Sequence, residues 1–501
     1  MSATETGPVR TPMPSSVPTD GIDPRGMRVI WLLLVAAFVA ILNETTMAIA
    51  IPHLNADLGL PPELGQWMTS AFMLTMAVVI PTTGFMLQRF TTRQVFLAAM
   101  IAFTLGTLIC LIAPGFTMLL IGRIVQAAGT GVMMPLLMTT MMNVVPPHSR
   151  GRMMGRVGLV MSLAPALGPT LSGAILEALS WRWIFGMILP IAIVALLLGA
   201  KWMLNLGETT RAPIDALSIV LSALSFGGIV FGLSQFGGGH GGEAGAATSS
   251  ATTGWVILAA GAVALALFVW RQLALQRKDD ALLDLRVFLS RNYVVSVVIM
   301  GVVAFSMFGT FSLLPQYLQN VAGLDSFQSG LVLLPGSILM GLLGPVMGRI
   351  YDARGPKTLL VPGTIMIALA MFVYSTAGEG TPVWLLVAIQ TVMSLGLAAS
   401  FTPLFSASLG SLERRLYSHG SAALNTLQQV AGATGTALLI SIYSSALHAG
   451  EAEGLAPAAA AAPGARSAFL VAAFIALVPV ALSFLIRKPA DQEGAPAPVG
   501  H

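Results

Sequence analysis

Fourteen apolar segments, each long enough to cross a lipid bilayer, constrain this chain more than any other feature of it. Crossing the hydrocarbon core takes about 20 mostly apolar residues. Such a segment must be helical, because its backbone groups find no water to bond to. The segments are residues 28–51, 66–87, 94–113, 117–142, 152–176, 182–203, 215–236, 254–275, 291–313, 327–349, 358–377, 381–409, 421–447 and 466–486. The sequence therefore predicts an all-α polytopic membrane protein with 14 transmembrane helices.

The charged residues support this class and indicate an orientation. Only 9% of the residues are charged, against about a quarter in soluble proteins. If the helices alternate from a cytoplasmic N-terminus, 22 of the 25 Lys and Arg residues lie on the cytoplasmic side, and Arg123, Arg182 and Arg466 are the exceptions. This positive-inside pattern predicts a multi-pass protein of the cell membrane with both termini cytoplasmic. It also explains the net charge of +4 without a nucleic-acid partner.

Two related segments predict that the chain has two repeated halves. "GFMLQRFTTRQVF" follows the second apolar segment and "GRIYDARGPKTLL" closes the tenth. Repeated halves are usual in secondary transporters, whose binding site lies between the repeats. The predicted parts are a disordered cytoplasmic tail (1–27), an N-terminal six-helix domain (28–203), two inserted helices with a cytoplasmic linker (204–290), a C-terminal six-helix domain (291–487) and a cytoplasmic tail (488–501).

The sequence argues against enzymes and ATP-driven pumps. It contains no phosphate-binding loop ending in Gly-Lys-Ser or Gly-Lys-Thr. None of its six histidines lies well inside a predicted helix, and its single cysteine, Cys110, excludes a cysteine-rich metal site. We therefore expect no catalytic residue, no metal and no cofactor, and transport that is driven by an ion gradient.

Glu44 and Arg123 are the only charges that lie clearly inside predicted helices. A charge at that depth costs about 2.5–3.5 kcal/mol on insertion scales, which marks it as a functional candidate. Glu44 lies roughly 10 Å from the outer end of its helix and Arg123 about 9 Å from the same side. Two interpretations remain open. Either the pair is a permanent ion pair that joins the two helices, or Glu44 faces a cavity and exchanges a proton.

Polar neighbours accompany both charges. Asn43 points about 100° away from Glu44 around the helix and is expected to bond to a neighbouring helix. Gln126 is one turn beyond Arg123 and is expected to orient it. In "GLVMSLAPALGPTLSG", two prolines bend the helix and four small residues let another helix approach closely. These residues are Gly158, Pro165, Gly168, Pro169, Ser172 and Gly173.

The motifs together resemble the fourteen-span drug:proton antiporters of the major facilitator superfamily, the EmrB/QacA type. "LNETTMAIAIP" is similar to that family's helix-1 motif, "RIVQAAGTG" to its helix-4 motif and "GPTLSG" to its antiporter motif. "WRWIF" and "NTLQQVAGATGTALL" are further landmarks, and the resemblance spans residues 28–487. It implies proton-coupled export by alternating access between two six-helix domains, with Glu44 as the proton carrier and Arg123 as its partner. The family often has Asp where this chain has Asn43.

The same resemblance assigns gating motifs to the cytoplasmic loops. The family usually has Asp four residues after the motif's Gly, and Gln88 stands at that position in the first half. The second half has the full pattern with Asp352. The candidate gating residues are Gly84, Gln88, Arg89 and Arg93, and Gly348, Asp352, Arg354, Gly355 and Lys357.

Methionine, aromatic and amide side chains are the candidates for a substrate cavity, since Met and aromatic residues suit an adaptable apolar site. They are Met47, Phe72, Met134, Phe305, Phe308, Gln316, Tyr317, Asn425 and Gln428. One acid among such residues predicts lipophilic, neutral or cationic drug-like substrates, exported by a monomer. The alternatives are a dedicated exporter of one endogenous antibiotic, lipid or peptide, and a non-transporting receptor or scaffold.

Overall fold

The computed structural model describes residues 24–59, 62–205, 215–237, 244–278, 280–324 and 326–487, and within these ranges the chain folds almost entirely into helices. One bundle contains α1 (Pro24–Leu58), α2 (Pro62–Arg89), α3 (Thr92–Ile112), α4 (Phe116–Val144), α5 (Arg150–Ala178) and α6 (Arg182–Trp202). A second bundle contains α10 (Arg291–Asn320), α11 (Ser326–Arg354), α12 (Lys357–Tyr374), α13 (Val383–Gly410), α14 (Tyr417–Ala452) and α15 (Pro457–Ser483). Between them in sequence come α7 (Ala216–Ser222), a π-helical turn (Ala223–Gly227), α8 (Gly228–Gly237) and α9 (Ala244–Gln276).

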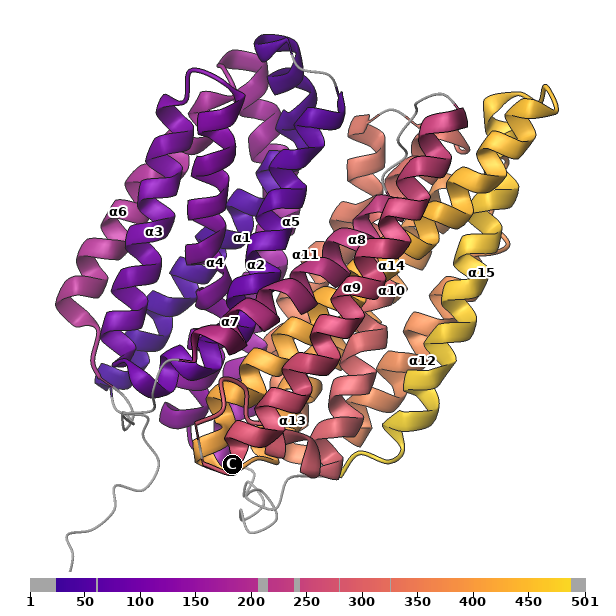
Figure 1. The fold of residues 1–501 in the computed structure, drawn as a ribbon. Coiled ribbons are helices and arrows are strands. Elements are labelled where there is room, and N and C mark those ends of the chain that lie inside the picture. The colour runs from indigo at the N-terminus through magenta and orange to yellow at the C-terminus, as the bar shows by residue number, and fades with distance from the viewer. Residues whose placement is uncertain are drawn as a thin grey trace, which may run out of the picture.

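The two bundles stand side by side, and α7, α8 and α9 pack along one seam between them (Figure 1). Small residues set the closest contacts inside each bundle. A Cβ at Gly106 of α3 would overlap the backbone of Gln126 in α4, and one at Gly435 of α14 would overlap the backbone of Phe305 in α10. Glycines at these crossings let backbones approach closely, which is how membrane helices associate without a hydrophobic driving force.

Twelve of the described helices are long and apolar enough to span a membrane, so the predicted count of 14 is not confirmed. The remaining two predicted segments are helical but differ from the rest. Residues 215–236 are interrupted by the π-helical turn, and their apolar part, Leu217–Leu233, is short. α5 has Arg150, Arg152 and Arg156 in its first two turns, which shortens its apolar stretch. The predicted tails, 1–27 and 488–501, lie almost wholly outside the described residues.

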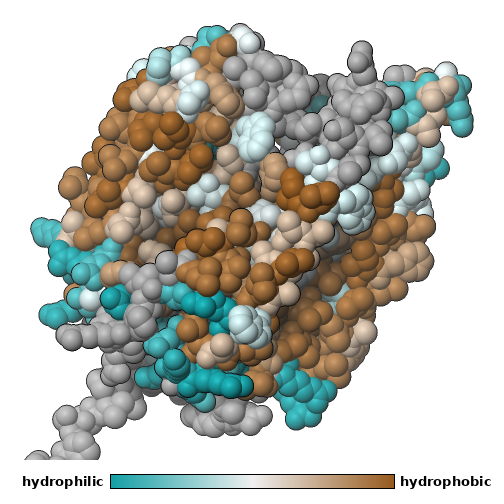
Figure 2. Space-filling view, in the orientation of Figure 1, coloured by the Kyte–Doolittle hydropathy of each residue, from teal (hydrophilic) through white to brown (hydrophobic). Residues whose placement is uncertain are grey.

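The described chain begins and ends on the same side of the molecule, at the lower end of Figure 1. We call this the terminal side. Figure 2 shows a brown, apolar surface over the middle of the helices and teal, hydrophilic patches at the lower rim. The surface is therefore divided as that of a membrane protein is, with an apolar belt and a polar rim.

On the terminal side, α5 and α11 meet backbone to backbone. A Cβ at Gly348 of α11 would overlap the carbonyl oxygen of Gly151 in α5. The carboxylate of Asp352 accepts hydrogen bonds of 2.8 Å from the backbone N–H groups of Gly151 and Arg152. These two groups lie in the first turn of α5, where an acidic partner is stabilising. Asp352 therefore ties the second bundle to the first.

A second seam on the terminal side joins α2 to α14 through neutral groups. Gln88 at the end of α2 donates a 2.9 Å hydrogen bond to the backbone carbonyl of Arg415, just before α14. One turn earlier, Gly84 lies against His419, so a Cβ at Gly84 would come within 2.9 Å of the imidazole Nδ1. Arg150 adds a 3.3 Å hydrogen bond to the hydroxyl of Tyr417. The two bundles are thus held together at both seams of this side.

A partly buried polar network anchors α7 and α9 to each other and to the segment that follows. Asp215 accepts two hydrogen bonds of 2.7 Å from Arg271 and a third from Ser218. Gln272 donates to Ser218 at 2.8 Å and accepts from the backbone N–H of Leu283 at 3.2 Å. Leu283 in turn packs in an apolar cluster with residues of α2 and α14. This network therefore places α7–α9 on the seam between the bundles.

We expect Asp215→Ala to lower the melting temperature of the purified protein by a few degrees. The change removes the acceptor of two charge-assisted hydrogen bonds that join the start of α7 to α9, and the partial exposure of both side chains keeps the effect small. Thermal unfolding in detergent measures the effect. Glu413→Ala is the matched control, because the Glu413–Arg415 pair is more than half exposed at both side chains. Equal shifts in the two variants would contradict the anchoring role of Asp215.

Candidate functional site

A cavity of about 340 Å³ lies between the two bundles. Eight helices line it: α1, α2, α4 and α5 from the first bundle, and α10, α11, α13 and α14 from the second. Its walls are mostly apolar and adaptable. The sulfur and aromatic side chains of the lining are Met76, Met134, Met138, Met154, Met307 and Met340, with Phe308, Phe311, Phe401 and Phe405. Flexible thioethers and rings of this kind let one cavity accept ligands of different shape.

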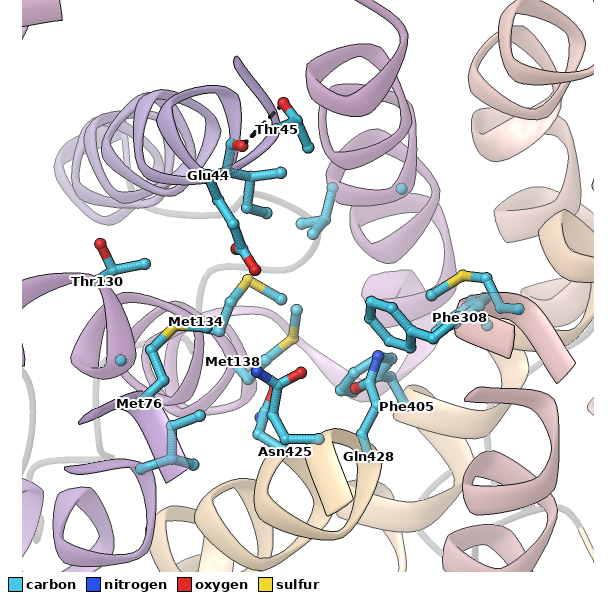
Figure 3. A pocket seen from close by; sticks show the side chains of 18 of the residues that line it. Glu44, Thr45, Met76, Thr130, Met134, Met138, Phe308, Phe405, Asn425 and Gln428 are labelled. Atoms are coloured by element: carbon cyan, nitrogen blue, oxygen red, sulfur yellow. Dashed lines mark hydrogen bonds between the residues drawn. The ribbon is translucent and has the colours of Figure 1, made fainter. Parts of the chain in front are cut away.

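Among the described residues of this lining Glu44 is the one acid, and its side chain points into the cavity (Figure 3). The helical repeat of α1 places Ile41, Glu44 and Thr45 on one face, and all three line the cavity. The Glu44 side chain makes no hydrogen bond or salt bridge to another described residue. Its carboxylate is therefore available to a ligand or a proton.

Asn43, one residue earlier, lies in a polar cluster behind the cavity wall. Its side-chain oxygen accepts a 3.2 Å hydrogen bond from Gln126, which also donates to Thr107 of α3 at 2.8 Å. The side-chain oxygen Oε1 of Gln126 accepts a 2.8 Å hydrogen bond from Arg123. As the sequence predicted, Asn43 bonds to a neighbouring helix and Gln126 orients Arg123.

Arg123 is fully buried, at 1% exposure, and its guanidinium lies 4.1 Å from the ring centroid of Phe72. It forms no salt bridge with Glu44 in this conformation, although the two groups remain close enough to interact electrostatically. Its Nε and the Nδ2 of Asn43 are buried without a partner among the described residues. The first interpretation, a permanent ion pair between Glu44 and Arg123, therefore does not describe this conformation.

The small residues of α5 bring that helix against α1 beside Glu44. A Cβ at Gly168 would overlap the hydroxyl of Thr45, and Ser172 donates a 2.9 Å hydrogen bond to the carbonyl of Thr46. Gly158 lines the cavity, whereas a Cβ at Gly173 would meet nothing within 4 Å. The side chains of Pro165 and Pro169 lie outside the described residues.

Four of the nine predicted cavity residues line the cavity: Met134, Phe308, Asn425 and Gln428. The other five do not, and three have clear reasons. Phe72 lies under Arg123, the Tyr317 hydroxyl donates to the carbonyl of Gly378 at 3.1 Å, and the backbone of Phe305 packs on Gly435. The structure also places Met47 and Gln316 outside the lining.

The predicted gating residues lie away from the cavity, on the terminal side. Gly84, Gln88 and Arg89 end α2, Gly348, Asp352 and Arg354 end α11, and Lys357 begins α12. Arg93 donates a 2.6 Å hydrogen bond to the carbonyl of Ala200 at the end of α6. Gly355 has a φ of 78°, which other residues rarely adopt, and so allows the tight turn between α11 and α12. These residues therefore connect helix ends.

Residues 33–436 match the sequence family described as the Major Facilitator Superfamily. The chain is 39% identical over 475 residues to a lincomycin resistance protein, LmrB, of Listeria monocytogenes, covering 94% of this chain and 98% of that protein. It is 31% identical over 424 residues to a multidrug resistance protein B homolog of Mycobacterium tuberculosis, covering 84% and 76%. Among solved structures, the proton:xylose symporter XylE aligns over 94% of this chain and 98% of its own, with a TM-score of 0.60 and 13% identity, which shows a shared fold.

Proposed function

This chain belongs to the major facilitator superfamily and is a transporter rather than an enzyme, and we propose that it is a proton-coupled multidrug exporter of the cell membrane. Its substrates are lipophilic neutral or cationic compounds. The observation that carries the proposal is the position of Glu44, a carboxylate that has no hydrogen-bond or salt-bridge partner among the described residues and lies in a cavity lined by Met and Phe side chains. Relatives named for lincomycin and multidrug resistance support the choice of drug-like substrates.

Coupling of substrate export to proton entry follows from the presence of one acid, Glu44, among the described residues of the lining. A bare carboxylate is costly in an apolar surrounding, so the cavity changes the side to which it opens only when Glu44 bears either a proton or a cationic substrate. Protons from outside displace the substrate from Glu44, and the protonated carrier returns to the cytoplasmic side. There the substrate displaces the proton. The proton gradient is thus the energy source.

The arrangement of the helices supports the fourteen-span, EmrB/QacA-type architecture. α4 ends on the terminal side and α6 begins on the opposite side, so α5, which connects them, crosses the membrane as well. The same reasoning applies to α7–α8, which lead from the end of α6 to the start of α9. We assign the terminal side to the cytoplasm, because most Lys and Arg residues lie there. The conformation is then closed toward the cytoplasm, and we propose that the working unit is a monomer.

The test is transport by the purified protein in vesicles with an acidic lumen. The probe is tetraphenylphosphonium, a permanent cation that an acidic lumen does not trap as it traps weak bases. We expect the probe to accumulate as a pH-sensitive dye reports lumenal alkalinisation, and both signals to vanish when nigericin dissipates the gradient. Protein-free vesicles are the control. If neither this probe nor lincomycin moves against its gradient, proton-coupled drug export is wrong for this chain.

A further inference from the structure

The carboxylate and the side-chain amides of the cavity lining lie on two opposite walls. Glu44 of α1 occupies one wall, and Asn425, Gln428 and Gln429 of α14 occupy the other. In Figure 3, Glu44 points toward the cavity from one side and Asn425 and Gln428 from the other, with Met134 and Met138 between them. The cavity therefore has an acidic pole and an amide pole that are separated by apolar side chains.

The helical repeat of α14 explains the amide pole. Residues 425, 428 and 429 are three and four positions apart and so share one face of the helix. One turn further on, the same face carries Gly432, where a Cβ would come within 2.6 Å of the ring of Phe308 in α10. The face thus changes from cavity lining to helix packing at Gly432, and the amides are the polar groups that it presents to the cavity.

These amides keep unused donors, whereas several hydroxyl groups of the lining have already used their single donor. Thr45 and Thr130 each donate to a carbonyl of their own helix, at 3.1 Å, and Ser337 donates to a carbonyl of α11 at 3.0 Å. By contrast, the side chains of Gln428 and Gln429 make no hydrogen bond to another described residue. Asn425 donates to the carbonyl of Ser421 at 2.8 Å, which leaves its side-chain oxygen available.

We propose that Asn425, Gln428 and Gln429 form a subsite for a neutral polar group of the substrate, opposite the cation site at Glu44. The preferred substrates are then organic monocations with an apolar body and a hydroxyl or amide group at the far end. This inference rests on the proposed function for the role of Glu44. It adds a specificity-determining face to α14.

The physical basis is the cost of leaving a polar group without a partner. A hydroxyl that enters an apolar cavity loses its bonds to water, and only a new partner compensates for the loss. The glutamine amides offer both donors and acceptors, so they bond to a hydroxyl or an amide in either direction. A site built in this way separates ligands that differ by one polar group more sharply than an apolar wall does.

Binding of two matched cations to the purified protein tests the subsite. The probes are octyltrimethylammonium and its 8-hydroxy derivative, which share charge and chain length, and calorimetric titration in detergent gives each Kd. In the wild type we expect the hydroxyl to weaken binding by less than about threefold. In Gln428→Leu and Gln429→Leu we expect it to weaken binding by at least about tenfold, because the group then enters an apolar wall.

Two control variants keep this result interpretable. Gln428→Asn retains an amide, and we expect it to restore most of the wild-type ratio of the two Kd values. Gln328→Leu makes the same chemical change at an exposed position of α11 and is expected to leave the ratio unchanged. Melting temperatures show whether each variant folds.

A ratio that is the same in the wild type and in both leucine variants would overturn the subsite, as would a tenfold penalty in the wild type itself. Binding requires no proton gradient, so this test stands apart from the transport assay. If proton-driven transport is absent while the ratio changes as expected, the proposed function fails and the subsite remains.

Discussion

Glu44→Gln is expected to abolish proton-coupled drug transport while the protein still folds. Glutamine has nearly the same shape and fits the same lining of the cavity, but it carries no charge and binds no proton. The variant therefore loses both the proton site and the partner for a cationic substrate. We expect accumulation driven by a pH gradient to fall by at least about tenfold, which corresponds to a loss of about 1.4 kcal/mol.

The measurement is the vesicle assay with tetraphenylphosphonium, in which substrate uptake and lumenal alkalinisation are followed together. Glu413→Gln is the matched control, since Glu413 is an exposed acid next to the start of α14, far along that helix from the cavity residues. We expect the control to transport like the wild type. If Glu44→Gln still exchanges substrate for protons at the normal rate, the carboxylate has no part in coupling.

A neutral compound separates the two roles of Glu44. Counterflow of a neutral substrate needs no proton movement and no charge on the carrier, so we expect Glu44→Gln to keep this activity. Loss of counterflow together with coupled transport would indicate damage to the cavity instead of removal of the proton site.

Gly348→Ala is expected to shift the protein away from the conformation described here. A Cβ at this position would overlap the backbone carbonyl of Gly151, and a backbone atom cannot move aside as a flexible side chain does. The bundles must then separate at the α5/α11 seam. Overpacking of this kind costs typically about 1–3 kcal/mol, which changes the ratio of the closed and open conformations by about 5- to 150-fold.

Distances between spin labels on the terminal side measure this shift. Exposed sites for labelling are available at His148, just before α5, and Thr358, in the first turn of α12, through His148→Cys and Thr358→Cys. The native Cys110 is buried and does not compete for the label. We expect Gly348→Ala to enrich the longer distances and to slow transport by at least about tenfold, because one state of the cycle is depopulated.

Gly330→Ala is the matched control for this variant. It makes the same change in the same helix, at a position where a Cβ would meet nothing within 4 Å. We expect its distances and its transport rate to match those of the wild type. Unchanged distances in Gly348→Ala would mean that the α5/α11 contact does not hold the terminal side closed.

The sequence predicted the positions of the helices and the importance of Glu44 better than it predicted which residues line the cavity. Long apolar segments depend only on local composition, so most helix positions follow from the sequence. Glu44 was found because a charge in such a segment has a cost whatever its neighbours are. The π-helical turn that interrupts residues 215–236 has no comparable signal, because nothing in its composition distinguishes it from the flanking helix.

The cavity residues were harder to predict because residue type does not show which way a side chain points. Phe72 and Met76 are one helical turn apart on α2, yet Phe72 lies under Arg123 and Met76 lines the cavity. Phe72 is kept out of the lining because the guanidinium of Arg123 from α4 packs on its ring, whereas Met76 reaches the cavity. In the same way, the sequence left both interpretations of Glu44 open, and only the packed helices show its side chain in the cavity lining without a salt bridge to Arg123. The direction in which such a side chain points is set by how the helices of the bundle pack together and is not encoded in any one helix.

The two seams of the terminal side differ in chemistry, and this has a consequence for how the molecule moves. At one seam, the carboxylate of Asp352 meets the start of a helix, and the backbones touch without side chains between them. At the other, the corresponding position is the neutral Gln88, which offers an amide to a carbonyl. A rotation that parts the bundles must break both seams, and we expect the weaker one to yield first. The contact between α2 and α14 is then the first to open, and the contact between α5 and α11 is the last to part as the terminal side opens.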